Sequence, residues 1–469
     1  MDYQNKLDEY IDHNFNTYIE QLKRLIRIPS ISQMPDKHKN DLYNVLDEVS
    51  EILKLYGFEN QIVDKHGFPC LISNLEIDKD KPWVTIYNHM DVQPAKEPQW
   101  EQKDPFEPIV KSDRIIARGS TDDKGPALSI IHAINFLKVN KLEMPNIQII
   151  YETEEEIGSP NFGKFLEQNK DLIKNSESVL VSDTIFEGDH PAITYKLKGV
   201  VRANIYLKTG DNDLHSGMMG GAISNPFNIL SHALSTSVDK IGNVTIENFF
   251  DNIPKMTQKE KEELQKVAKV FDLDKFHKDS NGAHLNSNKS DEILEKLWYK
   301  PTFEVHGFAG GQSEEYNENN DLKRTNIKTA IPYEALAKIT MRLVSGISKE
   351  EAIEKLEKHL KKVNSNFIVE SYGGAEAFGT EIDNSFMEKA RNACNIGFGK
   401  KALFVGSGGT IGAVPQFQKF FSNKPIVLIA QSLMSDNYHG PNENFKFEQA
   451  RKGIKTISNY LNEIANERS

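Results

Sequence analysis

The sequence predicts an α/β fold in which a mixed, mainly parallel sheet flanked by helices is interrupted by an inserted α+β domain with an antiparallel sheet. Short apolar runs of strand length alternate with helical patterns in the first and last parts of the chain. Between about residues 197 and 374, the strand-length segments instead alternate polar and apolar residues, which is typical of half-exposed antiparallel strands. The length of 469 residues also suits more than one domain.

The α/β part is predicted from elements at both ends of the chain. Residues 3–28 carry apolar side chains at helical spacing and end at Pro29, and residues 41–58 repeat that pattern up to Gly57. The helical pattern at 126–139 lies between strands. The predicted strands of this sheet are residues 83–92, 147–156, 178–183 and 425–430.

The inserted part is predicted from the middle of the chain. Residues 200–210 and 334–346 are the alternating strands, and helical patterns occupy 225–238 and 349–362. The lysine- and glutamate-rich stretch at 255–276 is interpreted as a solvated helix face. We therefore expect residues 1–197 and 375–469 to form one domain and residues 198–374 to form the insertion.

Composition excludes several classes of protein. The 57 basic and 68 acidic side chains give a net charge of −11, which argues against binding nucleic acid or an anionic membrane. No apolar run approaches the roughly 20 residues that span a bilayer, and the acidic, polar start does not resemble a signal peptide. The two cysteines, Cys70 and Cys394, are far apart, which excludes a disulfide framework and a thiolate metal cluster. We expect a cytoplasmic protein.

Histidines beside carboxylates at strand ends are the candidates for chemistry, because open α/β sheets place their sites there. His89 and Asp91 close the strand 83–92, and their spacing of two puts both side chains on one face. Asp91 could therefore orient the imidazole of a metal-binding His89. The alternative is a strand-end histidine capped by its neighbour.

Four more clusters follow strands or precede helices. Asp122 and Asp123 stand before Lys124-Gly125-Pro126, and Asp183 and His439 each follow a predicted strand. Each has a plain alternative, such as helix capping or turn formation. Glu154, Glu155 and Glu156 are either a cation site or an exposed acidic loop. Together the clusters form a nitrogen and oxygen ligand set without sulfur, which suits zinc, manganese or cobalt.

These segments, in this order, resemble the metallopeptidase family of carnosine dipeptidases, carboxypeptidase G, aminoacylase-1 and succinyl-diaminopimelate desuccinylase, and most of all its carnosine and non-specific dipeptidase branch. H-x-D followed by D-D-K-G and E-E-x-G is a specific series, and the matching segments span the chain from near one end to near the other. The matching segments are RIPSIS (27–32), NHMDVQPA (88–95), ARGSTDDKGP (117–126), EEEIGS (154–159), ITYKLKGV (193–200), LHSGMMGG (214–221), KTAIP (328–332), RLV (342–344) and HGPNE (439–443).

The resemblance implies a zinc-exopeptidase-like catalytic domain with two divalent metal ions, zinc or manganese, with cobalt possible. Asp122 would bridge the two ions, and the peptide bond after it would be cis. His89 and Asp183 would complete the coordination of one ion, and Glu156 and His439 that of the other. Glu155 matches the general base, which takes a proton from a metal-activated water, and Asp91 matches the residue behind the first histidine.

The resemblance also implies residues for substrate binding and assembly. His215 of L-H-S-G would stabilise the oxyanion from the partner subunit of a homodimer paired through the inserted lid domain. Arg342 would hold the substrate's terminal carboxylate, with Thr329 and Thr410 as further contacts. The glycine-rich residues 404–414 do not form a dinucleotide motif, because Ile411 stands where G-x-G-x-x-G needs its last glycine.

The predicted function is hydrolysis of dipeptides. The alternatives are an N-acyl amino acid amidohydrolase or another exopeptidase on the same scaffold, and, from another class, a non-catalytic peptide-binding protein, which would be expected to lack Glu155 or a ligand. Two positions depart from the family's pattern: Ser407 stands where a glutamate is usual, and Tyr372 where close relatives have histidine. Both leave the preferred side chains open.

Overall fold

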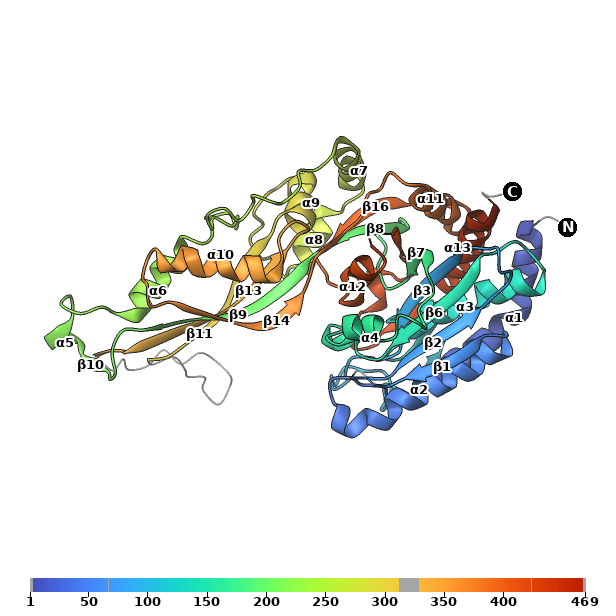
Figure 1. Cartoon of the computed structure of the whole chain (residues 1–469), viewed down its shortest axis with the longest axis horizontal. Coiled ribbons are helices and arrows are strands. Elements are labelled where there is room, and N and C mark those ends of the chain that lie inside the picture. The colour runs from blue at the N-terminus through green and yellow to red at the C-terminus, as the bar shows by residue number, and fades with distance from the viewer. Residues whose placement is uncertain (1–2, 66, 312–328, 423, 467–469) are drawn as a thin grey trace.

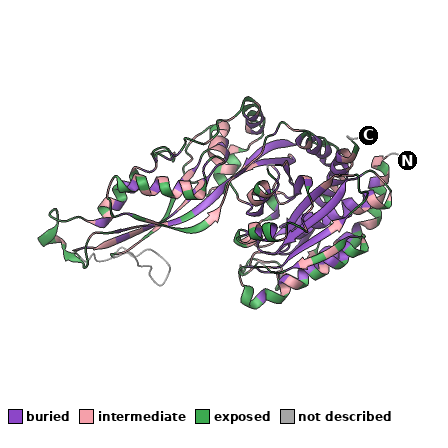
Figure 2. Ribbon diagram, viewed as in Figure 1, coloured by how far each residue is buried: buried purple, intermediate pink, exposed green. Residues whose placement is uncertain are grey.

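The computed structural model describes residues 3–65, 67–311, 329–422 and 424–466. It has an elongated outline, with a large sheet and its helices at one end and a long antiparallel sheet reaching away from them (Figure 1). The two sheets have different burial (Figure 2): a central strand of the large sheet, residues 146–152, is buried at every position, whereas buried positions alternate along residues 334–343 of the long sheet. This confirms the predicted fold class.

The large sheet is mixed, with a parallel centre. Its order is β1-β2-β6-β3-β7-β17-β8-β15, with β16 also paired to β8. The pairs β6/β3, β3/β7, β7/β17 and β8/β16 are parallel. The strands are β1 (Glu59–Val63), β2 (Cys70–Leu75), β3 (Trp83–His89), β6 (Asn146–Glu152), β7 (Ser176–Val181), β8 (Ala192–Leu197), β15 (Phe378–Gly379), β16 (Leu403–Ser407) and β17 (Ile426–Ile429).

Helices cover both faces of this sheet because its strands are apolar on both sides. One core cluster joins it to α1 (Tyr3–Ile26), α2 (Pro35–Leu55), α3 (Lys124–Val139), α11 (Ser385–Phe398) and α13 (Phe447–Asn466). A second cluster covers the opposite face with α4 (Phe162–Gln168) and α12 (Ala413–Phe420). A small sheet of β4 (Ile109–Val110), β5 (Arg114–Ile116) and β18 (Asn444–Lys446) lies beside them.

The long sheet is antiparallel in the order β11-β13-β9-β14 and has its own core. Helices α6 (Pro226–Ser235) and α10 (Lys349–Lys361) contribute Leu230 and Leu356 to that core. Its strands are β9 (Gly199–Lys208), β11 (Thr302–Ala309), β13 (Glu334–Leu343) and β14 (Ile368–Ala375). At its far end are the two-stranded pair β10 (Leu214–His215) and β12 (Ala330–Ile331) and the short helix α5 (Ser216–Met219) (Figure 1).

Part of the segment 198–374 packs on the large sheet rather than on the long one. Helices α7 (Gln258–Ala268) and α9 (Ser290–Tyr299) bury Leu264, Val267, Leu294 and Trp298 in the core cluster of the large sheet. The stretch predicted as a solvated helix face therefore has one buried side in α7, while α8 (Leu273–Asp279) has no buried residue. A Cβ on Gly406 would lie 2.6 Å from the Trp298 ring, so glycine there allows the close approach of α9 to β16.

The parallel centre brings several chain segments to one edge. Strands β3, β6 and β7 run in the same direction, so the residues that follow them meet at their carboxyl ends. These residues include Asp91, the 3₁₀ turn η1 (Glu155–Ile157) and Asp183. A second such turn, η2 (Met434–Asp436), follows β17. In the part of the chain that the structure describes, no helix is long and apolar enough to cross a membrane.

Candidate active site

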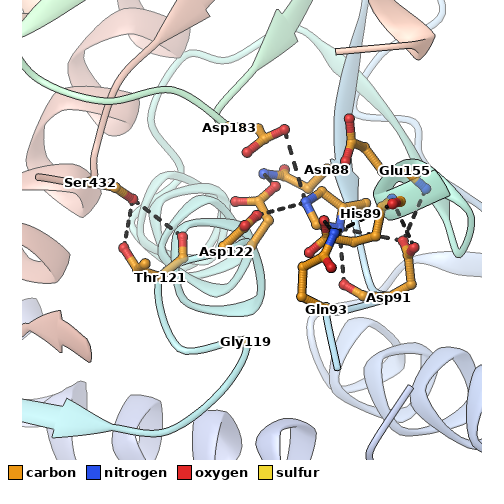
Figure 3. A network of polar contacts seen from close by, with 12 residues as sticks. Asn88, His89, Asp91, Gln93, Gly119, Thr121, Asp122, Glu155, Asp183 and Ser432 are labelled. Carbon is orange, nitrogen blue, oxygen red and sulfur yellow. Dashed lines mark hydrogen bonds and ion pairs between the residues drawn. The ribbon is translucent and has the colours of Figure 1, made fainter. Parts of the chain in front are cut away.

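His89 ends β3 with a fully buried side chain. Its Nδ1 lies 3.0 Å from the backbone oxygen of Asp91, which fixes the ring from behind. Its Nε2 then faces the other carboxylates, at 3.0 Å from Asp122 Oδ1 and 3.9 Å from Asp183 Oδ2 (Figure 3). The imidazole is therefore oriented by one neighbour and presents its second nitrogen to a group of carboxylates.

Asp91 connects β3 to the acidic turn that follows β6. Its two carboxylate oxygens accept hydrogen bonds from the backbone N–H groups of Glu155, at 3.2 Å, and Glu156, at 3.0 Å. The carboxylate oxygen nearest His89 Nδ1 is 3.4 Å away, farther than the Asp91 backbone oxygen. Asp91 thus supports His89 through its main chain and positions the turn with its side chain.

Asp122 lies between two histidines. Its Oδ1 contacts His89, and its Oδ2 lies 2.9 Å from Nε2 of His439. The Asp122–Asp123 peptide is cis. The buried Glu443 carboxylate accepts hydrogen bonds from Arg118 Nη1 and from the backbone N–H groups of residues 119, 121 and 122. These bonds fix the backbone of the loop that carries Asp122.

The three consecutive glutamates have three different environments. Glu154 is buried and accepts hydrogen bonds from the backbone and side-chain nitrogens of Asn161, at 2.7 and 3.0 Å. Glu156 lies 3.2 Å from His439 Nε2 and accepts a hydrogen bond from Gln93. Glu155 lines the adjoining pocket. The acidic stretch is therefore not an exposed loop.

The electrostatics of this cluster favour cations. Burial, together with repulsion from Asp183 and Glu156, raises the pKa of Glu155 well above its usual value, and burial also raises that of Asp183. Hydrogen bonds to Asp122 and Glu156 raise the pKa of His439 to about 10. Buried carboxylates that repel one another and draw protons onto nearby histidines gain most from a positive charge between them.

The donor set fits divalent metal ions. Among the described residues, ligand atoms of His89, Asp122 and Glu156 all lie within 4.8 Å of one another, as do those of His89, Asp123 and Asp183. The donors are imidazole nitrogen and carboxylate oxygen, which transition metals share. All five residues predicted as ligands lie in this cluster, since His439 contacts both Asp122 and Glu156.

A pocket of about 350 Å³ adjoins the cluster. Asp122, Glu155, Asp183 and His439 line one side, and the glycine-rich residues 406–411 line another. Thr410, in that loop, accepts a 3.1 Å hydrogen bond from Arg342 Nη1 on β13. Burial, and then the nearby Arg202, lower the pKa of Arg342, which marks a site that gains from an anion.

His215 and Thr329 are brought together, but away from this pocket. His215 on β10 pairs with Ala330 on β12, and the Thr329 backbone oxygen accepts hydrogen bonds from Ser216. This pair lies at the far end of the long sheet from β3 (Figure 1). The predicted site residues therefore fall into two groups in one chain: a cluster around Asp122 and a pair at the tip.

Several residues of the site were given no role of their own from the sequence. Asp123, grouped there with Asp122, has a buried oxygen, Oδ1, that has no partner among the described residues, while its Oδ2 accepts a hydrogen bond from Asn88. Gln93 bonds Glu156, and Arg118 and Glu443 form a fully buried ion pair. All of these residues lie within the motif segments, so the sequence marked them only by their position next to candidate metal ligands. The residues with which they form hydrogen bonds and ion pairs lie in distant segments of the chain.

Comparison with known proteins agrees with this geometry. The profile of peptidase family M20/M25/M40 matches residues 85–463. Human Beta-Ala-His dipeptidase is 26% identical over 98% of this chain and 92% of its own, and the Schizosaccharomyces pombe Cys-Gly metallodipeptidase dug1 is 28% identical over 98% of both. The Sulfolobus solfataricus M20 family metallo-carboxypeptidase Sso-CP2 is 27% identical with a TM-score of 0.82, covering 96% of this chain and 99% of its own.

Proposed function

Since this chain belongs to peptidase family M20/M25/M40, we propose that it is a metal-dependent dipeptidase. The observation that carries the proposal is a cluster of five metal-ligand candidates beside one pocket, which Glu155 also lines. Thr410 lines the same pocket and accepts a hydrogen bond from Arg342. Relatives named as dipeptidases, which match nearly the whole chain, support the same activity.

We assign two divalent cations to the cluster, zinc or manganese, with cobalt as a further candidate. Asp122 would bridge them, with His89 and Asp183 on one and Glu156 and His439 on the other. When bound, the cations would supply Lewis acidity toward the scissile carbonyl and the attacking water. The 3.0 and 2.9 Å contacts of Asp122 with His89 and His439 support its central place.

Glu155 is the proposed general base. It lines the pocket, its backbone is held by Asp91, and it is not needed to complete the five-residue ligand set. Burial and neighbouring carboxylates raise its pKa, which brings the carboxylate closer to the range in which it can accept a proton from water and return it to the leaving amine. Asp91 positions Glu155 and Glu156 together.

Arg342 and Thr410 are proposed to bind the carboxylate at the substrate's carboxyl terminus. Arg342 donates to Thr410, and Lys198, whose pKa is lowered to about 8 by burial and by Arg342, adds positive charge. The pocket volume of about 350 Å³ is at the small end of ligand sites. A small substrate with a fixed negative end suits this arrangement.

The tip of the long sheet is proposed to complete the site of a partner subunit in a cytoplasmic homodimer. His215 is exposed, and it lies beside the exposed apolar side chains of Leu214, Met218 and Met219. A second copy would cover these apolar groups and bring His215 to the oxyanion, with Thr329 beside it. Residues 198–374 would then act as the lid and dimerisation domain.

Two other activities fit the same cluster. One is removal of an acyl group from an N-acyl amino acid. The other is carboxypeptidase action on longer peptides, which is favoured by the similarity to a protein named as a metallo-carboxypeptidase. In all three activities the substrate has a terminal carboxylate that Arg342 and Thr410 would bind. The substrates differ only in the group on the other side of the scissile bond.

A substrate panel distinguishes the three activities. The purified protein, loaded with zinc or manganese, is assayed against dipeptides, their N-acetyl derivatives, matched tripeptides and N-acyl amino acids. We expect kcat/KM to be highest for free dipeptides. A preference of tenfold or more for N-acyl amino acids or for tripeptides would replace the dipeptidase assignment with one of the alternatives.

A further inference from the structure

One carboxylate in the pocket plays no part in the metal cluster. Glu187 lines the pocket four residues after Asp183, and among the described residues its carboxylate has neither a hydrogen bond nor an ion pair. Burial raises its pKa to about 7. A partly buried acid without a partner is costly in a folded protein unless a ligand supplies the missing positive charge.

The neighbouring positive groups are directed to a different acid. Glu187 and His190 close a tight turn through reciprocal backbone hydrogen bonds of 3.2 and 3.0 Å. Asp189, at the exposed end of this turn, pairs with His190 at 2.9 Å and with Lys400. The turn therefore pairs its outer carboxylate with two cations and directs the inner carboxylate of Glu187 into the pocket.

The pocket that Glu187 lines also has a large apolar surface. The large apolar side chains that line the pocket are Ile185, Phe186, Leu197, Trp298, Val405, Ile411 and Met434. Phe186, Leu197 and Trp298 are nearly fully buried, so this surface is packed in place. Asp122, Glu155 and Asp183 belong to the proposed metal site, so among the described lining residues Glu187 is the carboxylate that remains beside this apolar surface. An apolar surface and a carboxylate together match a long aliphatic stem that ends in a cation.

We propose that Glu187 is a specificity-determining residue that binds the charged end of a lysine- or arginine-like side chain of the substrate. This inference rests on the proposed peptidase function. The side chain's methylene groups would lie against Phe186, Leu197 and Trp298 while its ammonium or guanidinium group pairs with Glu187. Pairing would give the carboxylate the positive partner that it lacks in the protein alone.

The test measures selectivity between matched substrates. Values of kcat/KM are determined for dipeptides with Lys, Met or Glu at the first position and, separately, at the second, using wild type, E187Q and E187K. We expect E187Q to lower the Lys-to-Met ratio by about tenfold or more at one of the two positions, since a neutral amide cannot form the ion pair with the lysine ammonium group. E187K should reverse the preference toward Glu at that position.

The matched control is D189N, which alters the exposed acid of the same turn. It should keep the wild-type ratio. An unchanged ratio in E187Q, or an equal loss on all dipeptides, would overturn the proposal, because the latter means a role in binding the common backbone or in folding. If wild type cuts no dipeptide, the peptidase proposal fails instead, and calorimetric binding of lysine against norleucine to wild type and E187Q still decides the role of Glu187.

Discussion

At the scale of single residues, hydrogen-bond partners distinguish side chains of the same type. Glu154 is tied to Asn161, Glu156 contacts His439, and Glu155 faces the pocket, although all three are consecutive carboxylates. The turn η1 directs them apart, and Asp91 fixes its backbone. We therefore expect substitutions at positions 154, 155 and 156 to affect stability, proton transfer and metal binding separately.

Replacing Glu155 with Gln should lower kcat by about 100- to 10,000-fold while both metal ions stay bound, because an amide cannot accept the proton of water. Metal content is measured on the same sample by elemental analysis. The matched control is E154Q, which should reduce thermal stability through its bonds to Asn161 and keep far more activity. Near-normal turnover of metal-loaded E155Q would remove Glu155 as the base.

Removing the metal ions should abolish activity. The ligand candidates combine imidazole and carboxylate, so zinc, manganese or cobalt should restore the chelated protein, and calcium or magnesium should hardly do so. The measurement is dipeptide hydrolysis after dialysis against chelator and then against each metal. Full activity in excess chelator would contradict the metal site.

At the scale of elements, helix α3 both begins at the site and anchors it. It starts directly after Asp123, and its first residue, Lys124, is buried with Nζ donating to the backbone oxygens of Leu25 and Ile28 at 2.9 Å. Farther along, His132 of α3 lies 2.8 Å from Gln21 of α1. The helix that follows Asp122 is therefore fixed to α1 at two points.

His132 should make this contact sensitive to acid. Burial lowers its pKa to about 4, against about 6.5 for an exposed histidine, so the folded protein binds fewer protons there than the unfolded chain. Stability from this group is constant above about pH 6.5 and falls as the pH drops toward 4, by at most about 3 kcal/mol. Urea unfolding of wild type and H132Q at several pH values should show H132Q gaining relative stability below pH 6.5. Parallel curves would contradict the assignment.

At the scale of the whole molecule, the proposed site residues form two groups that lie far apart in one chain. His215 lies at the tip of the long sheet, and the metal cluster lies at the carboxyl ends of β3, β6 and β7 (Figure 1). Exposed apolar side chains surround His215 at that tip, including Met218, which is 77% exposed. Both features agree with a second copy that completes the site.

Subunit mixing tests this assembly. H215A and E155Q should each be nearly inactive, but a heterodimer of the two contains one site with both residues intact. Random pairing makes about half the dimers heterodimeric, each with one good site of two, so about a quarter of wild-type activity should return. Sedimentation showing a monomer, with no recovery on mixing, would exclude the proposed role in trans and leave the metal cluster unaffected.

The sequence alone was enough to predict the main elements and the acidic cluster. Strands such as 83–92 and 147–156 are apolar on both faces, and this local pattern fixes their burial in a helix-covered sheet. The amphipathic patterns at 3–28 and 349–362 likewise correspond to α1 and α10. The clusters at strand ends indicated a nitrogen and oxygen metal site, and the family resemblance chose His89, Asp122, Glu156, Asp183 and His439 within them.

Only the tertiary structure decided which partners these residues have. Asp91 binds the Glu155 turn, Glu443 holds the Asp122 loop from 321 residues away, and α7 buries a face that its charged sequence did not predict. The role of Glu187 also depends on Asp189 taking the nearby cations and on Trp298 reaching the pocket. Long-range contacts of this kind depend on how the helices and strands pack against one another, and the local hydrophobic periodicity of the sequence does not predict that packing.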